Sequence, residues 1–141
     1  MSQIDPLSIA HEFLHRLGSG AEPAAVAELF AEDIVWEIPG DTRAFPWIGQ
    51  QSGRQAVLTF LRETSARIER VRLDVDDVLA NEKRAVILGS LASRVRSTGK
   101  LIETSFAIVL TIQEGQIAHF QMLEDSFAVS CAATLGKSEN R

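Results

Sequence analysis

The chain has 141 residues, of which 45% are hydrophobic and 23% charged, a composition typical of a single globular domain over residues 1–141. Its formal net charge of −5 disfavours nucleic-acid binding, which needs a basic surface. The single cysteine, Cys131, excludes an intramolecular disulfide and a zinc site built from cysteines. No apolar run approaches the ~18 residues of a membrane span and no leader-like segment opens the chain, so we expect a cytoplasmic protein with no membrane partner.

Two helices are expected near the N-terminus. Asp5 supplies an N-cap oxygen and Pro6 suits the first helical turn, so the sequence predicts a helix that a glycine at 18 or 20 ends. A second helix is predicted from Pro23 to about Ala31, because another proline opens it and apolar residues follow at helical spacing.

A short strand and a long loop follow these helices. The strand is predicted over Ile34 to Ile38, with Trp36 and Ile38 on the same face. The loop over residues 39–52 is long for a compact domain, and such loops often carry function. Its aromatic residues, including Trp47, could form the wall of a pocket or close the end of the core, and the sequence favours neither role.

A third helix and four strands make up the rest of the predicted fold. Ser52 and Gln55 have capping-box spacing, which predicts the start of the helix, and it should end near Glu69. Beyond it the hydrophobic period changes from about 3.6 to about 2, and the connections become short enough to join only antiparallel neighbours. The predicted strands are Val71 to Leu79, Ala85 to Arg96, Leu101 to Ile112 and Gln116 to Asp125.

The turns between these strands predict a register. A two-residue turn at Glu114 and Gly115 pairs Gln113 with Gln116, and a four-residue turn at Ser97 to Lys100 pairs Arg96 with Leu101. The resulting pairs on the face that carries Asp125 are Leu123 with Phe106, Gln121 with Ile108, His119 with Leu110, and Leu91 with Phe106.

This geometry excludes several charged residues as candidate catalytic groups. Arg94 and Glu103 are expected to form a cross-strand ion pair on the other face, and alternation places Glu124 on the face opposite Asp125. Six residues of extended chain separate His119 from Asp125 by about 20 Å, so the two cannot form a catalytic dyad. We expect His119 to be a core or interface histidine.

Asp125 remains the candidate acid or base. It ends an otherwise apolar strand face, where burial would raise the pKa of its carboxyl group towards neutrality. Alternatively, Asp125 caps the following segment, SFAVSCA, as an N-cap residue. The residues alone leave the two interpretations open.

Three stretches carry a resemblance to a known family: LFAEDIVWEIPG, PWIGQQSGRQAVLTFL and RVRSTGKLIETSFAIVLTIQEGQIAHFQMLEDSFAV. They resemble the SnoaL-like branch of the nuclear transport factor 2-like superfamily, which includes polyketide cyclases and relatives of ketosteroid isomerase. The resemblance implies a cystatin-like α+β fold, in which a cone-shaped, curved antiparallel sheet wraps around three N-terminal helices. It also implies a homodimer that packs sheet on sheet. In this resemblance Asp125 matches the aspartate that the cyclases use as acid or base.

These observations lead to a main hypothesis and two alternatives. The main hypothesis is an enzyme of the isomerase or cyclase type, which moves protons on a polyketide-like or terpenoid-like substrate through Asp125 and needs no cofactor or metal. The first alternative is a non-catalytic module of the same fold that binds a hydrophobic small molecule or dimerises. The second is an epoxide hydrolase, because such relatives keep a similar aspartate. The residues expected to contact the substrate are Trp36, Ile38, Trp47, Phe60, Leu91, Phe106, Ile108, Gln121 and Leu123.

Overall fold

One curved sheet of six strands and three helices make up the computed structural model, which describes residues 5–38 and 49–124. The helices are α1 (Pro6–Gly18), α2 (Pro23–Ala27) and α3 (Arg54–Arg67). In the sheet the strands lie in the order β2-β1-β6-β5-β4-β3. Their bounds are β1 Phe30–Ile38, β2 Gly49–Ser52, β3 Ile68–Ala80, β4 Arg84–Val95, β5 Leu101–Gln113 and β6 Gln116–Glu124.

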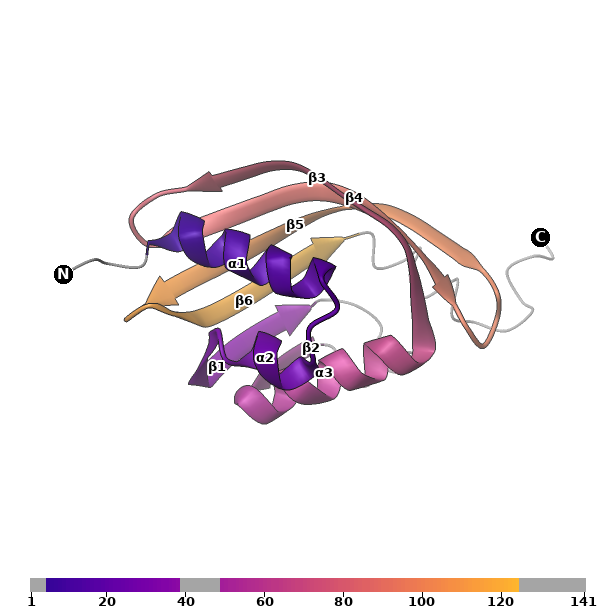
Figure 1. The fold of residues 1–141 in the computed structure, drawn as a ribbon, viewed down its shortest axis with the longest axis horizontal. Coiled ribbons are helices and arrows are strands. Elements are labelled where there is room, and N and C mark those ends of the chain that lie inside the picture. Colours follow the sequence, from indigo (N-terminus) through magenta and orange to yellow (C-terminus); the bar gives the residue numbers. More distant parts are fainter. Residues whose placement is uncertain (1–4, 39–48, 125–141) are drawn as a thin grey trace.

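The helices cover one face of the sheet (Figure 1). α1 packs against β3, β4 and β5, while α3 contacts α2, β1, β2 and β3. The main hydrophobic core lies between these two layers and takes buried side chains from the three helices and from β1, β4, β5 and β6. The predicted α+β architecture with a curved sheet around N-terminal helices is therefore confirmed.

The first helix begins as predicted. The backbone N–H of Ser8 donates a hydrogen bond of 2.8 Å to the Asp5 carboxylate, which caps α1 and lowers the pKa of Asp5. Ile9, Ala10 and Phe13 are buried on one side of this helix, at the spacing of an amphipathic helix. α1 is thus held at its start by a cap and along its length by the core.

Two N-terminal boundaries differ from the prediction. α2 ends at Ala27 rather than near Ala31, because Phe30 already belongs to β1 and is buried in the sheet. The capping box is also wrong, since Ser52 lies in β2 and Gly53 is the N-cap residue of α3. Gly53 has a φ of 92° and its N–H donates to the Ile34 carbonyl at 2.7 Å, a turn conformation that suits glycine.

The antiparallel meander from β3 to β6 is confirmed, and β1 joins it in a way that the sequence did not predict. β1 runs parallel to β6, with Trp36 opposite Phe120 and Glu37 opposite Gln121. β2 then pairs antiparallel with the other edge of β1. The parallel pair places Trp36 and Phe120 side by side on the inner face of the sheet.

The predicted register between β5 and β6 holds at the hairpin and fails beyond it. Gln113 pairs with Gln116 across a two-residue turn, in which Glu114 and Gly115 have φ values of 54° and 79°. The register then shifts between Thr111 and Ile112, as at a β-bulge. The pairs beyond the shift are Ile108 with Met122, Ala107 with Leu123, and Phe106 with Glu124. The inner face of β6 therefore carries Phe120 and Met122 rather than Gln121 and Leu123.

The predicted register between β4 and β5 is wrong by two residues. The turn closes one residue earlier than expected, with the Val95 N–H donating to the Lys100 carbonyl at 2.9 Å and Gly99 adopting a φ of 76°. Arg94 consequently lies opposite Leu101, and its guanidinium donates to the Gly99 carbonyl. The predicted Arg94–Glu103 ion pair does not form. The Glu103 carboxylate instead lies 3.9 Å from the Arg72 guanidinium.

The backbone at Gly89 packs closely against the neighbouring strands of the sheet. A Cβ atom at this position would lie 2.1 Å from the Asp74 carbonyl oxygen and 2.9 Å from the Phe106 ring. The register of β3 shifts next to it, between Val75 and Asp77. The absence of a side chain thus lets β3 and the Phe106 ring approach β4 closely.

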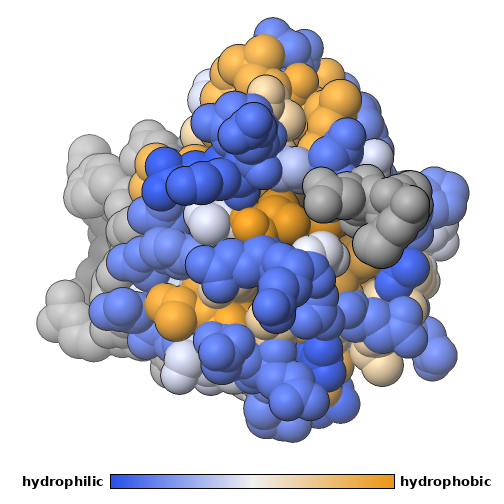
Figure 2. Space-filling view, turned by 90° about the vertical axis from the view of Figure 1, so that its left-hand side faces the viewer, coloured by the Kyte–Doolittle hydropathy of each residue, from blue (hydrophilic) through white to orange (hydrophobic). Residues whose placement is uncertain are grey.

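The end of the molecule at which α1 begins and the β3–β4 and β5–β6 hairpins turn is largely hydrophilic (Figure 2). Apolar side chains are visible there in separate patches between polar ones. The hairpin turns beneath this surface include polar residues such as Asn81, whose side chain accepts hydrogen bonds from the N–H groups of Lys83 and Arg84.

Candidate functional site

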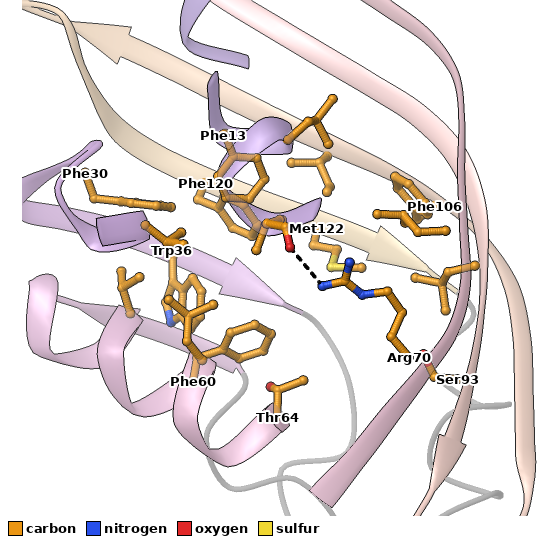
Figure 3. A pocket seen from close by; sticks show the side chains of 18 residues that line it. Phe13, Phe30, Trp36, Phe60, Thr64, Arg70, Ser93, Phe106, Phe120 and Met122 are labelled. Atoms are coloured by element: carbon orange, nitrogen blue, oxygen red, sulfur yellow. Dashed lines mark hydrogen bonds between the residues drawn. The ribbon is translucent and has the colours of Figure 1, made fainter. Parts of the chain in front are cut away.

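A cavity of about 190 Å³ lies between the helices and the inner face of the sheet (Figure 3). Three of the 18 side chains that line it, those of Thr64, Arg70 and Ser93, carry a hydroxyl or a charge. The others are aliphatic or aromatic, or the thioether of Met122: Phe13, Leu14, Leu17, Val26, Phe30, Trp36, Val57, Phe60, Leu61, Leu73, Leu91, Phe106, Ile108, Phe120 and Met122. Such a wall favours an apolar ligand held by a few polar contacts.

One end of the cavity is aromatic. The ring of Phe120 lies 5.9 Å from that of Phe13, 6.0 Å from that of Phe30 and 5.5 Å from that of Trp36, measured between centroids. The Trp36 ring also packs edge-on against Phe60 of α3, at 4.5 Å. Edge-to-face and tilted contacts at these distances stabilise the cluster and hold its rings in place.

The β-bulge in β6 builds this wall. By shifting the register, it turns Phe120 and Met122 towards the helices and leaves His119 and Gln121 on the outer face. Phe106 reaches the cavity from β5, opposite Gly89, where no side chain competes for the space. Two local backbone features thus determine which side chains line the cavity.

The three polar side chains lie at the other end, where α3 is followed by β3 (Figure 3). Thr64 belongs to the last turns of α3, and Arg70 of β3 lies directly opposite Ser93 of β4. The Arg70 guanidinium extends into the cavity and donates to the Leu17 carbonyl of α1 at 3.5 Å. The cavity is therefore polarised, with the ring cluster around Phe120 at one end and a cation with two hydroxyl groups at the other, on the side where Figure 3 also shows Phe106.

Trp36 contributes a buried donor as well as an aromatic surface. Its indole nitrogen is buried and has no hydrogen-bond partner among residues 5–38 and 49–124, and Trp36 is 2% exposed. In Figure 3 this nitrogen lies on the side of the ring turned away from Arg70. Native proteins leave few buried donors without a partner, so this N–H is a point at which a bound water or ligand would be stabilised.

Comparison with known proteins identifies the family that has this architecture. The model of the SnoaL-like domain family matches residues 10–120, most of the chain. The chain belongs to the SnoaL-like family. No curated protein matches it.

Several solved structures have the same fold as this SnoaL-like domain. An NTF2-like protein from Burkholderia xenovorans LB400 is 25% identical, with a TM-score of 0.82 over 95% of this chain and 99% of its own. A protein with a ketosteroid isomerase-like fold from Catenulispora acidiphila, in complex with trimethylamine, is 18% identical, with a TM-score of 0.70 over 89% and 94%. TerC, co-crystallised with polyporic acid, is 14% identical, with a TM-score of 0.75 over 91% and 97%.

Five residues predicted to contact the substrate line the cavity of this SnoaL-like domain: Trp36, Phe60, Leu91, Phe106 and Ile108. Three others do not line it. Ile38 is buried elsewhere in the core, Gln121 lies opposite Val109, and Leu123 is 47% exposed. Trp47 and the candidate acid Asp125 lie outside the described residues, so their contribution to the site stays a prediction.

The sequence contained a signal for part of the lining that was missed. In β6 the apolar residues Phe120 and Met122 alternate with the polar residues His119 and Gln121, which favours Phe120 and Met122 as the inner pair. The prediction instead assigned to the inner face the residues that alternate with Asp125, including Gln121 and Leu123. Arg70 had no such signal, because nothing in its local sequence distinguishes an inward arginine from an exposed one.

His119 lies on the outer face, away from the cavity. Its Nε2 atom is 2.8 Å from a carboxylate oxygen of Glu37 on the neighbouring β1, and both side chains are about one-third exposed, at 37% and 36%. No group of three histidine, cysteine, aspartate or glutamate side chains able to hold a metal occurs in residues 5–38 and 49–124. None of the helices found in that part of the chain is long and apolar enough to span a bilayer.

Proposed function

We propose that this SnoaL-like domain is a cofactor-independent acid/base enzyme that acts on a hydrophobic small molecule, such as a polyketide-like or terpenoid-like compound. The single observation that carries the proposal is the partly open aromatic cavity, with polar groups at one end only. An apolar wall excludes water and strengthens any charge interaction made inside it. Two proteins of the same fold hold trimethylamine and polyporic acid in their structures, which supports a ligand-binding role.

Asp125 is the proposed acid or base, on the strength of its position in the sequence and of the family resemblance. The preceding residue, Glu124, ends β6 opposite Phe106, on the face that carries Phe120 and Met122. Glu124 is therefore the second carboxylate to test, although alternation in the sequence had set it aside. A carboxyl group beside an apolar cavity can transfer protons near neutral pH once desolvation has raised its pKa.

Deuterium exchange tests this proposal directly. Phenylacetone combines an apolar ring with acidic C–H groups next to a carbonyl, so a base in the cavity should speed loss of its α-protons in D₂O, followed by proton NMR. Replacing the catalytic carboxylate should slow the exchange by about a hundredfold or more. We expect this loss in Asp125→Asn and near wild-type exchange in Glu124→Gln.

The outcomes separate the hypotheses. Exchange that survives Asp125→Asn but is lost in Glu124→Gln would move the acid/base role to Glu124. Binding of phenylacetone without any catalysed exchange would favour the alternative of a non-catalytic small-molecule-binding or dimerisation module. The described cavity lining offers Arg70 but no aspartate, so no specific observation favours epoxide hydrolysis.

The proposed biological unit is a cytoplasmic homodimer that packs sheet on sheet. The outer face of the sheet bears partly exposed apolar side chains next to polar ones, including Leu88, Val109 and Leu123. Sedimentation equilibrium of the wild type and of Leu123→Glu tests the dimer. A charge at a buried dimer contact should produce monomers, and an unchanged dimer would exclude Leu123 from the interface.

A further inference from the structure

Arg70 is the one cationic side chain in the described lining of the cavity, and its donors are largely unused. A guanidinium has five N–H donors, while the recorded partner of Arg70 is the Leu17 carbonyl, at the long distance of 3.5 Å. No carboxylate in the described chain pairs with it. By contrast, Arg16 on the neighbouring helix bonds two carboxylates and a carbonyl oxygen at 2.6 to 3.1 Å. Arg70 thus has donors available for a ligand.

The surroundings of Arg70 favour an anion over a neutral partner. Arg70 lines the cavity and is also exposed to solvent, so an incoming ligand can reach its guanidinium and water screens its charge except where it faces the apolar wall. Arginine also binds a carboxylate through two parallel hydrogen bonds, a geometry that neither a single hydroxyl nor a carbonyl can reproduce. Ser93, directly opposite Arg70, and Thr64 on α3 add hydroxyl donors at the same end.

The dimensions of the cavity limit the rest of the ligand. A cavity of roughly 150 Å³ lined by aliphatic and aromatic residues can hold benzene. The present cavity, at about 190 Å³, therefore has room for one ring with a short acidic side chain. The ring would lie against Phe120 and Trp36, and the acidic group would extend towards Arg70 (Figure 3).

We infer that the cavity selects small aryl or alkyl carboxylates, with the apolar body among the aromatic side chains and the carboxylate on Arg70. This inference rests on the proposed function, because it names the substrate class of the same cavity. Arg70 would act as the specificity-determining residue. It would position the ligand and stabilise negative charge that develops on the carboxylate when an adjacent C–H loses its proton.

Phenylacetate and phenylacetamide test this inference, because they have nearly the same shape and differ in charge. Binding can be followed by isothermal titration calorimetry of the otherwise unaltered chain. We expect phenylacetate to bind at least about tenfold more tightly than the amide, in keeping with a charge-assisted, bidentate hydrogen bond. Arg70→Gln should remove this preference and leave amide binding within about threefold. Arg70→Lys should retain part of it.

Arg96→Gln is the matched control. Arg96 also makes one long side-chain hydrogen bond, of 3.4 Å to the Ser65 carbonyl, but it does not line the cavity. We expect this variant to keep the full preference for phenylacetate. Circular dichroism of all variants checks that each is folded, and a folded Arg70→Lys keeps the test decisive if Arg70→Gln does not fold.

Each result decides the inference. Equal affinity of the wild type for the acid and the amide would overturn carboxylate selection while leaving a hydrophobic binding site in place. A preference that persists in both Arg70 variants would overturn the role of Arg70. Failure of both compounds to give a calorimetric binding signal or to compete with phenylacetone would overturn the inference together with the proposed cavity function.

Discussion

Replacing Gly89 with alanine adds one methyl group where the sheet has no room for it. The new Cβ would lie 2.1 Å from the Asp74 carbonyl oxygen, a backbone atom that can move only if β3 shifts away from β4. It would also lie 2.9 Å from the Phe106 ring, which lines the cavity. Overpacking of this kind costs about 1–3 kcal/mol. For a domain of this size, that loss lowers the melting temperature by roughly 3–12 °C.

Thermal and urea denaturation followed by circular dichroism measure this effect, with Gly18→Ala as the matched control. Gly18 ends α1, and a Cβ there would meet nothing within 4 Å. Its replacement should change stability by no more than about 0.5 kcal/mol. Phenylacetate binding should also weaken in Gly89→Ala, because a displaced Phe106 ring narrows the cavity. If Gly89→Ala were as stable as Gly18→Ala, the close approach of β3 to β4 would be refuted.

Three further substitutions test other parts of the fold. Phe120→Ala should lower the free energy of unfolding by about 3–5 kcal/mol in urea titrations, because it removes the ring that joins the aromatic cluster. Leu79→Ala, at a position of β3 that is 52% exposed, should cost under about 1 kcal/mol. Gly53→Ala should destabilise the domain by about 1 kcal/mol, since φ is 92° there, and Ser52→Ala should not, because Ser52 is not the cap of α3. The pKa of Asp5 is lowered in the folded state, so this residue stabilises the fold above its unfolded pKa and the contribution is lost as the pH falls through the folded pKa. Asp5→Asn keeps a cap but cannot titrate, so urea titrations from pH 6 to pH 3 should show a shallower acid loss of stability than in the wild type.

Local signals in the sequence predicted the elements well where each signal acts within a few residues. Asp5 and Pro6 marked the start of α1, and the two-residue turn before Gln116 gave the correct first pair of the last hairpin. The change in hydrophobic period after α3 predicted four antiparallel strands whose bounds lie within a few residues of those observed. Capping, turn geometry and alternation depend on neighbouring residues, which a single sequence displays.

The cavity lining was harder to predict because it depends on register. The shift between Thr111 and Ile112 reverses which side chains of β6 face the helices, and no local residue preference marks it. The parallel pairing of β1 with β6 joins Trp36 to Phe120 across more than half of the chain, so neither strand indicates its partner. Arg70 faces inward because Ser93 and α1 lie opposite it, a relation set by the assembled fold.

The place of β1 in the sheet also bears on how the chain folds. β1 is hydrogen-bonded to β2 on one side and to β6 on the other, so the segment from β1 through α3 joins the larger part of the sheet by way of the last strand. Contacts between residues this far apart in sequence close slowly, because the loop entropy is lost before they form. During synthesis, the β1–β6 pairs must wait until β6 has left the ribosome. β1 therefore emerges long before its partner on this side, and loss of β6 by truncation would separate β1 and β2 from the rest of the sheet.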